Sequence, residues 1–581
     1  MINYKIINPV TETNSLHQIL KNRGITDYFH YLNTTDKDIN DYLLLGKDNL
    51  KQALNALLSA CYYKKKVLVI VDSDCDGFTS SALLLNYLYK IFPHWVETSF
   101  DWFIHDGKQH GLQDCLEDIL QNEYSIVITP DSASNDYEQH KILKNNQQTI
   151  IILDHHLADF TSEDAIVINN QLSEYPNKNL SGVGVTWQFC RFIDATLNVN
   201  YADNFLDLVS IGLIGDMMDM RDFETVHLIR KGLKQFNNPF LTYLIKKNQY
   251  VFGNEITPIK AAFYIVPLIN AMTRSGTLQE KHLIFKSMLD YQAFNEILSN
   301  KRGHKLKETE LLVEQAVRTA TNVKNRQKKA EDNGLELLDQ KIQEHNLLQH
   351  KVILFLLEPN QIDKNIAGLV ANKIMAKYNR PCCVLTGMIN EQGQQVYRGS
   401  LRGCANTPNF RQVCLDTQEI NWCYGHNNAA GIEIPSDNIN NFLSKTDKIL
   451  EDLPLDIVYN VDLIYNNKYI DEKDILAIGK ADFLWGQKID EPFIIVKNLY
   501  CNKNQISLLS PDKSPTIKIH LANIDIIKFK SSEEEFRTLS TDEGVILNIV
   551  ARACVNEWNG NITPQLQVVD YEIAKTIPFV F

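Results

Sequence analysis

Acidic residues follow apolar segments at four places in the first part of the chain. KVLVIVDSDCDG, YSIVITPD and QTIIILDHH each run from an apolar stretch into acids, and IGLIGDMM holds one acid among apolar residues. Carboxylates at alternate positions after a strand can converge on one point as the chain turns. The candidate site residues in these segments are Asp72, Asp74, Asp76, Asp131, Asp154, His155, His156 and Asp216.

The chemistry of this set is that of a divalent metal site. The three acids of DSDCDG repel one another at such close spacing, so they need a cation nearby. Asp and His together are suitable ligands for Mn²⁺ or Mg²⁺, and imidazole favours Mn²⁺ over a metal that binds only oxygen. Asp216 lies in an apolar segment, where a buried acid needs a partner that a metal can supply.

Two other interpretations of these residues have less support. DSDCDG resembles the start of a calcium-binding EF-hand loop, but Leu83 stands where that loop needs its last glutamate, and an apolar strand precedes it. Asp131 taken alone could cap the following helix. A pair of histidines directly after an acid, at the end of a third strand, is much less common as a purely structural feature.

The segments that carry these residues predict an α/β fold. Apolar strands at about 66–71, 124–130 and 149–154 alternate with helical patterns, which indicates a doubly wound parallel sheet. Ligands on such sheets bind at the carboxyl ends of the strands, where all three acidic clusters fall. The charged stretch from about 295 to 345 predicts one or two long linking helices. A second α/β unit follows from 350, and short alternating strands from about 453 predict a small β-barrel.

The composition limits the class of protein. The chain has 581 residues, which suggests three to four domains of roughly 150 residues each. Its 44% hydrophobic content is typical of a globular protein, and its apolar runs are only as long as strands, so we expect no membrane association. The first residues, MINYKIINPV, lack the pattern of a secretory signal. We therefore expect a cytoplasmic protein.

Charge and cysteines exclude two further classes. The formal net charge of −13 disfavours a protein that coats DNA over a broad basic surface, although a local basic path remains compatible with it. The eleven cysteines form no CxxC pair, so a structural zinc site is not indicated and reduced, mostly buried thiols are expected.

The order of the acidic segments resembles that of the DHH phosphoesterase superfamily. DSDCDG, the Asp131 unit, DHH and the acid of LIGDMMDM appear in the order typical of that family. The resemblance implies two Mn²⁺ or Mg²⁺ ions. One is held by Asp74 with help from Asp72, and Asp131 bridges to the other ion. It implies further roles, with Asp76, His155 and Asp216 on the second ion, Asp154 orienting the histidines and His156 facing the scissile phosphate.

Later segments resemble the RecJ branch of this superfamily. VPLINAMTRSG places Arg274 near the DNA strand, and GLVANKIMAKYNRPCCVL, YRGSLRG and YGHNNAAGIEI are similar to the DHHA1 motifs, in which Ser400, Arg402 and His426 would grip phosphates. NEWNGNITPQLQVVDYEI resembles the RecJ OB domain. The chain departs from the family where an Arg precedes a GYGL turn, because it has HDGKQHGL there. His105 and Lys108 are the DNA-binding candidates in that turn.

The resemblance implies a domain order and an activity. The domains are a helical segment at 1–50, a DHH domain at 51–290, a helical linker at 291–345, a DHHA1 domain at 346–445 and an OB-like barrel at 446–581. The activity is that of a 5′→3′ exonuclease on single-stranded DNA in recombination and repair. The protein would be a monomer with a helicase or a single-strand-binding protein as candidate partners.

Three points stay open at the level of sequence. A small-nucleotide phosphodiesterase and a binding scaffold without catalysis are the alternative functions, although a scaffold predicts broken metal motifs and none is broken. Basic residues that could line a DNA path are Arg274, Arg302, Lys305, Lys307, Arg398 and Arg402. The basic run at 301–329 can equally be the solvated face of a helix.

Overall fold

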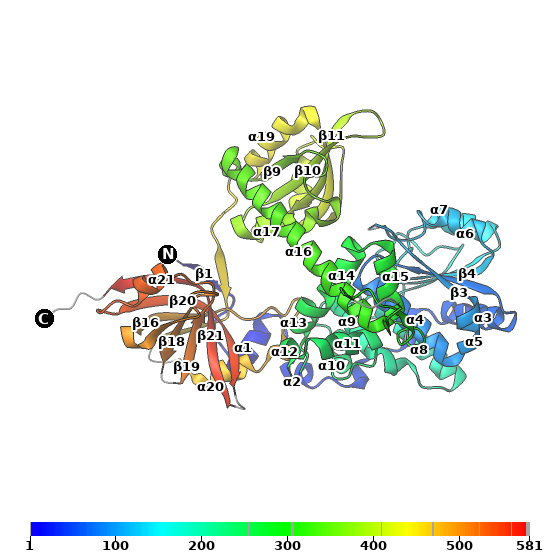
Figure 1. Cartoon of the computed structure of the whole chain (residues 1–581), viewed down its shortest axis with the longest axis horizontal. Helices are drawn as coiled ribbons and strands as arrows, with labels where there is room; N and C mark the ends of the chain where they lie inside the picture. The colour runs from blue at the N-terminus through cyan, green and yellow to red at the C-terminus, as the bar shows by residue number, and fades with distance from the viewer. Residues whose placement is uncertain are drawn as a thin grey trace.

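A computed structural model describes residues 2–107, 109–253, 255–303, 307–407, 409–466, 470–521, 523–558 and 561–576. Two predicted DNA-contact residues, Lys108 and Lys305, lie outside these ranges. Figure 1 shows a first α/β domain on the right, a second α/β domain above it, and a C-terminal sheet domain on the left. The long helix α16 (Leu312–Glu344) runs from the first domain to the second.

The sheet of the first α/β domain is entirely parallel, with strand order β3-β2-β4-β5-β6. Its strands are β2 (Lys66–Val71), β3 (Phe100–Ile104), β4 (Tyr124–Pro130), β5 (Thr149–Asp154) and β6 (Ile166–Asn169). The near-continuous burial of β2 and β5 is typical of parallel strands covered on both faces. The doubly wound sheet that the alternating pattern predicts is therefore present.

The two faces of this sheet belong to two apolar cores. Val67, Val69 and Val71 join the larger core, together with α4 (Cys75–Ile91), α8 (Gly182–Leu197) and α9 (Leu206–Gly215). Leu68 and Ile70 join a smaller core with α6 (Leu116–Gln121) and α7 (Tyr137–Asn145). Because successive side chains of a strand point to opposite faces, apolar residues line both faces of the sheet, and helices cover both.

Further helices complete the first domain. A short helix α13 (Pro258–Lys260), a π-helical turn η4 (Ala261–Ile265) and α14 (Val266–Ser275) follow one another without a break, and α14 packs against α16. The others are α3 (Lys47–Tyr62), α5 (Pro93–Ser99), α10 (Phe223–Gly232), α11 (Pro239–Lys247), α12 (Gln249–Phe252) and α15 (Leu278–Ser287).

The linker differs from the prediction at its start. The stretch from about 295 was expected to be helical, but β7 (Glu296–Leu298) and β8 (Thr309–Leu311) form a short antiparallel pair before α16 begins. The side chain of Glu310 on β8 is buried and ion-paired with Arg318 and Lys301. Part of the basic run at 301–329 is therefore engaged in folding this hairpin onto α16.

The second α/β domain contains a five-stranded mixed sheet of order β12-β13-β11-β10-β9. Its strands are β9 (Ile353–Leu357), β10 (Cys382–Ile389), β11 (Gln395–Arg402), β12 (Trp422–His426) and β13 (Ala429–Pro435). The helices are α17 (Lys364–Tyr378), α18 (Phe410–Asp416) and α19 (Ile439–Ile449). Helix α17 packs against α16 and against β11.

The C-terminal domain is built on a seven-stranded sheet of order β15-β16-β20-β21-β19-β18-β17. Its strands are β15 (Leu463–Asn466), β16 (Ile494–Cys501), β17 (Ile506–Leu509), β18 (Thr516–Leu521), β19 (Ile524–Lys528), β20 (Val545–Trp558) and β21 (Asn561–Thr576). Helices α20 (Glu472–Gly479) and α21 (Glu533–Leu539) accompany it. The predicted run of alternating strands is present, but β20 and β21 are longer than the short strands expected.

The N-terminal segment was predicted to be helical, and the structure corrects this in part. Helices α1 (Ser15–Asn22) and α2 (Tyr28–Leu32) are present, but β1 (Asn3–Ile6) pairs in parallel with β14 (Val458–Val461). Figure 1 shows the N-terminus beside the C-terminal sheet. The first strand of the chain therefore pairs with a strand in its C-terminal part.

Within the described ranges, no helix combines the length and the apolar content that crossing a membrane requires.

Candidate metal centre

The predicted metal ligands lie together at the carboxyl ends of β2, β4 and β5. Ligand atoms within 4.8 Å of one another form three groups: Asp72 with Asp74 and Asp131; Asp76 with His155 and Asp216; and Asp131 with Asp154, His155 and His156. Asp131 and His155 each belong to two groups, so the groups overlap. The group of Asp72 and the group of Asp76 share no residue, and the third group connects them through Asp131 and His155.

His155 lies at the junction of these groups. Its Nε2 atom is 3.2 Å from Asp131 Oδ1, 3.3 Å from Asp216 Oδ2 and 3.9 Å from Asp76 Oδ2. Among the described residues, His155 Nε2, Asp131 Oδ1 and Asp72 Oδ1 are buried without a hydrogen-bond partner. Buried polar atoms are rarely left unpaired, so these converging atoms fit a divalent cation as their missing partner.

The electrostatics of the cluster also favour a bound cation. Burial raises the pKa of Asp76 to about 7 and that of Asp216 to about 8, and the negative charge of Asp74 adds to both shifts. Burial raises the pKa of Asp131 well above its ordinary value, and burial lowers the pKa of His155 to about 4. A bound cation would reverse the effect on the carboxylates, because it stabilises their charged form.

Hydrogen-bond donors at helix starts orient two of the carboxylates. Asp76 Oδ2 accepts a hydrogen bond from the backbone N–H of Gly182 at 2.7 Å, and its Oδ1 accepts from Ser181 Oγ at 3.0 Å, at the start of α8. The side chain of Asp74 caps α4 by accepting from the N–H of Gly77. Both acids therefore sit at helix N-termini, where negative charge is stabilised.

The backbone at Asp131 and Ala133 is in a conformation that residues other than glycine seldom adopt. Asp131 has φ of 68° and Ala133 has φ of 77°, both in the left-handed region. Gly182 packs so closely that a Cβ there would lie 2.5 Å from Asp131 Cβ and Oδ1. Strained backbone of this kind clusters at functional sites, because the surrounding structure must hold it in place.

Asp154 organises the two histidines. Its Oδ1 accepts from the backbone N–H of His155 at 2.7 Å and lies 2.8 Å from His156 Nδ1, while its Oδ2 accepts from the N–H of Ser134. Burial lowers the pKa of His156, but the hydrogen bond to Asp154 outweighs it and raises that pKa to about 9. Because the side chain of His156 is 53% exposed, its imidazolium is available to an anionic substrate.

Comparison with known proteins identifies the family. A family model described as the N-terminal domain of the DHH family matches residues 66–213. The chain is 35% identical over 570 residues to a candidate single-strand DNA-specific exonuclease, YorK, of the SPbeta prophage in Bacillus subtilis strain 168. That match covers 97% of this chain and 96% of YorK. It is also 24% identical to the single-stranded-DNA-specific exonuclease RecJ of the same strain, over 94% of this chain and 66% of RecJ. The chain belongs to the RecJ-like family.

Solved structures agree on the fold. The structure of Thermus thermophilus RecJ in complex with Mn²⁺ superimposes with a TM-score of 0.71 at 18% identity, over 97% of this chain and 76% of that one. Its complex with Mg²⁺ gives a TM-score of 0.65 at 16% identity, over 99% and 79% of the two chains. The predicted α/β fold with a parallel sheet and a RecJ-like arrangement is therefore confirmed.

Two arginines predicted from RecJ motifs lie near each other, one from each α/β domain. Arg274, at the end of α14, is partly buried, and burial lowers its pKa against the opposing charges of Asp74 and Glu331. Burial likewise lowers the pKa of Arg402 on β11, and the positive charge of Arg274 adds to that effect. Residues from the first and second domains thus form one basic region beside the metal centre.

The other DNA-contact candidates in the second domain differ in their setting. Ser400 is partly buried on β11 close to Gly368 of α17, and His426 is exposed at the end of β12. Arg398 is ion-paired with the buried Glu433, so its charge is already compensated. Two further candidates, Arg302 and Lys307, lie before β8 in the linker and are exposed.

His105 requires a correction. It was predicted to contact DNA, but its side chain is fully buried and its Nδ1 lies 2.9 Å from Asp114 Oδ2. It packs edge-on against Phe103 at the end of β3. An imidazole enclosed in this way offers no atom to a nucleic acid strand.

Sequence reasoning missed several residues that shape the site. Asn270 Oδ1 accepts from the N–H of Cys75 at 3.1 Å and so ties α14 to the first turn of α4. His110 lies 2.6 Å from Asp72, and Asn169 donates to Ser134 Oγ and to the carbonyl of His156. Sequence signals existed for all three, because His110 lies in the divergent HDGKQHGL turn, Asn270 in the RecJ-like VPLINAMTRSG segment and Asn169 at the end of an apolar strand, but none was chosen as a site residue.

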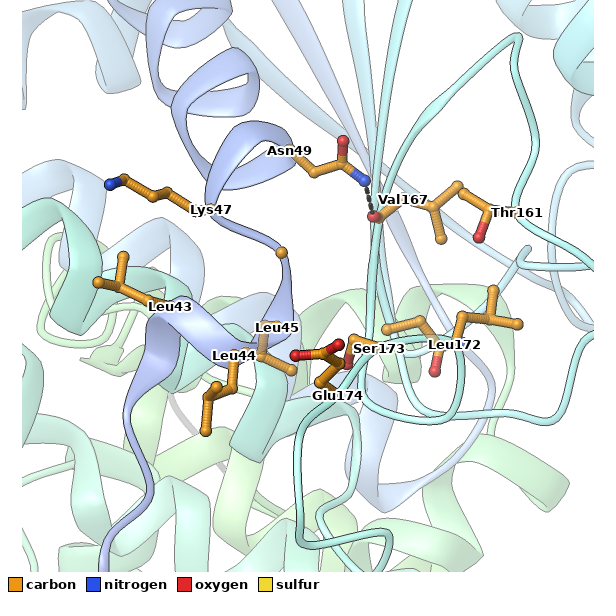
Figure 2. Close-up of a pocket in the computed structure, with 12 residues that line it drawn as sticks. Leu43, Leu44, Leu45, Lys47, Asn49, Thr161, Val167, Leu172, Ser173 and Glu174 are labelled. Carbon is orange, nitrogen blue, oxygen red and sulfur yellow. Dashed lines mark hydrogen bonds between the residues drawn. The ribbon is translucent and has the colours of Figure 1, made fainter.

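A separate hollow of about 350 Å³ lies beside the end of β6 (Figure 2). Leu43, Leu44 and Leu45 line one side and Leu172 and Glu174 the other, with Asn49 donating to the carbonyl of Val167. Its lining mixes single polar groups with leucines and contains none of the metal-ligand groups found among the described residues. The overlapping ligand groups remain the candidate site.

Proposed function

We propose that this protein is a single-strand-specific DNA exonuclease that hydrolyses phosphodiester bonds with two divalent cations, Mn²⁺ or Mg²⁺. The observation that carries the proposal is the overlap of the three ligand groups, which are linked through Asp131 and His155, where buried atoms have no other partner among the described residues. The names of the RecJ-like relatives supply the substrate class. The 5′→3′ direction and a role in recombination and repair follow from the same family resemblance.

Each residue has a distinct part in the proposed site. Asp72, Asp74 and Asp131 would hold one cation, and Asp76, His155 and Asp216 with Asp131 the other. When bound, such a pair activates water and neutralises charge on the phosphate oxygens. His156, held by Asp154, donates a charged hydrogen bond to the phosphate. Such preorganised donors stabilise the charge that develops in the transition state without reorganising during the reaction.

The chain's own cations would position the strand. Arg274 and Arg402 come from the two α/β domains and would bind consecutive phosphates, for which guanidinium groups are suited. Ser400 and His426 would add polar contacts on the second domain. The net charge of −13 does not oppose this role, because steering depends on the local field around the site. We expect a monomer whose helicase or single-strand-binding partners resemble those of its family.

Digestion of end-labelled DNA tests the proposal. Single-stranded DNA labelled separately at each end is incubated in Mn²⁺, with duplex DNA and a dinucleotide alongside and with a chelator as control. Rapid release of the 5′ label from single strands only, abolished by the chelator, is the expected result. Cleavage of the dinucleotide alone would indicate a small-nucleotide phosphodiesterase, and binding without cleavage would indicate a scaffold. Either result would refute the exonuclease proposal.

A further inference from the structure

His110 belongs to HDGKQHGL, the segment in which the sequence departs from the family pattern, and it contacts the predicted metal ligand Asp72. His110 Nδ1 lies 2.6 Å from Asp72 Oδ2, and the Asp72 side chain is 1% exposed while that of His110 is 58% exposed. The other oxygen, Asp72 Oδ1, is buried without a hydrogen-bond partner among the described residues. One oxygen of this carboxylate is therefore fixed by His110, and the other is left for a cation.

A buried lysine holds the start of the same turn. Lys281 on α15 is 1% exposed, and its ammonium donates to the carbonyls of His105 at 2.9 Å, Asp106 at 2.6 Å and Gly107 at 3.4 Å. Burying an ammonium is costly unless its donors are satisfied. These three carbonyls satisfy the donors of Lys281, so the lysine holds residues 105–107 in place.

Two aspartates hold the other end of the turn. The N–H of Leu112 donates to Asp136 Oδ2 at 2.7 Å, and Asp114 pairs with His105. Gly111 has φ of 73°, and a Cβ there would lie 2.2 Å from Asp136 Oδ2. Contacts hold residues 105–107 before His110 and Leu112 after it, so the imidazole has a defined position beside Asp72.

We infer that His110 is a positioning residue for Asp72, and that Lys281 supports it by holding residues 105–107 of the preceding chain. The terminal torsion of an aspartate is broad, so an unrestrained carboxylate samples many orientations. A hydrogen bond to its outer oxygen narrows that range, as partners of metal-binding side chains do in other proteins. The inference rests on the proposed two-cation site.

The experiment measures Mn²⁺ binding to the purified full chain by electron paramagnetic resonance, which needs no nuclease activity. We expect His110→Ala to weaken one of the Mn²⁺ sites by roughly 10- to 100-fold, as is typical when such partners are removed. His110→Asn should restore part of the affinity, because its amide can donate where Nδ1 stood. Lys281→Met should weaken the same site less, since His110 remains. If Lys281→Met does not fold, the two His110 variants still decide the question.

Matched controls lie elsewhere in the chain. His520 is also an exposed histidine whose Nδ1 lies 2.7 Å from an aspartate, Asp525, but it belongs to the C-terminal sheet. His520→Ala should leave Mn²⁺ binding unchanged. Lys286→Met, on the same helix as Lys281, should do the same.

The outcomes separate this inference from the proposed function. Unchanged Mn²⁺ affinity in His110→Ala would overturn the positioning role. If the unaltered protein binds Mn²⁺ but digests no DNA, and His110→Ala binds it more weakly, the nuclease proposal fails while the inference stands. Absence of Mn²⁺ binding by the unaltered protein would overturn both. In an active enzyme, the variant should need more Mn²⁺ for half-maximal rate and recover kcat at saturation.

Discussion

Asp131 combines the two properties that define the metal centre at the residue scale. It belongs to two ligand groups, and its backbone has a φ of 68° that aspartate tolerates better than most residues. Its N–H donates to the carbonyl of Leu153, which continues the pairing of β4 with β5 up to the site. The sheet therefore positions this carboxylate where it could bind both of the proposed cations.

Asp131→Asn separates charge from shape at this position. Asn keeps the size and tolerates the left-handed backbone, so the fold should persist while the bridging charge is lost. We expect hydrolysis to fall by more than about 100-fold, because even indirect partners of a metal cost roughly 10- to 100-fold. Binding of single-stranded DNA, measured by fluorescence anisotropy, should remain within a few-fold of the unaltered protein.

Asp219 provides the control for that variant. It lies three residues after Asp216, but its carboxylate is paired with Arg221 and it belongs to none of the ligand groups found in the described ranges. Asp219→Asn should retain activity. Full activity in Asp131→Asn would show that the proposed bridge is wrong.

At the scale of elements, the close approach of α17 to β11 decides where Arg402 points. Gly368 on α17 has no side chain, and a Cβ there would lie 2.4 Å from Arg402 Nη2. The space that this glycine leaves is filled by the guanidinium, which also donates to the carbonyl of Leu401. Helix α17 thus orients the arginine toward the basic region shared with Arg274.

Gly368→Ala should therefore reproduce the effect of Arg402→Ala. The clash involves the far end of a flexible side chain, so Arg402 moves and the fold is retained. We expect KM for a single strand to rise with little change in kcat, and the slope of log affinity against log salt to fall by about one. Steady-state kinetics and a salt series measure this.

A second helical glycine is the control for this change. A Cβ built on Gly334 of α16 would have only apolar atoms as its three nearest neighbours, from Val370 at 3.2 Å and from Ile362 at 3.5 Å. Gly334→Ala should leave KM unchanged. If Gly368→Ala also leaves KM unchanged, Arg402 does not bind substrate in the orientation seen here.

At the scale of the whole molecule, the two ends of the chain are joined. Arg23 and Asp462 are 439 residues apart, yet the guanidinium donates to both carboxylate oxygens at 2.8 and 3.0 Å. The side chains are only 9% and 0% exposed. Because β1 also pairs with β14, the N-terminal segment is fastened to the C-terminal part of the chain by both contacts.

Arg23→Met should destabilise the protein by about 3–5 kcal/mol, because it leaves Asp462 as an uncompensated buried charge. Chemical denaturation followed by tryptophan fluorescence measures the change. The double variant Arg23→Met/Asp462→Leu should recover most of the loss, since an apolar pair replaces the ion pair. Arg537→Met is the control, because its pair with Glu533 is exposed and should contribute at most about 1 kcal/mol. Equal effects of Arg23→Met and Arg537→Met would contradict a docking role.

The clustering of the candidate metal ligands could be predicted from the sequence because its causes are local. An apolar strand brings its last side chain to the carboxyl edge of a parallel sheet, and Asp72, Asp131 and Asp154 each lie at the end of such a strand. The chemistry of carboxylate and imidazole then indicates a divalent cation. Arg274 and Arg402 could be named as candidates in a similar way, because each lies at a fixed position within a recognisable sequence motif.

Only the tertiary structure decided how distant segments meet. His105 is buried against Asp114, and His110 contacts Asp72 while Lys281 binds the carbonyl of His105. Arg274 and Arg402 lie near each other although they belong to different domains. Strand β1 also pairs with β14. These contacts depend on the packing of elements that are far apart in the chain, and no local pattern of residues specifies which of many such surfaces will come together.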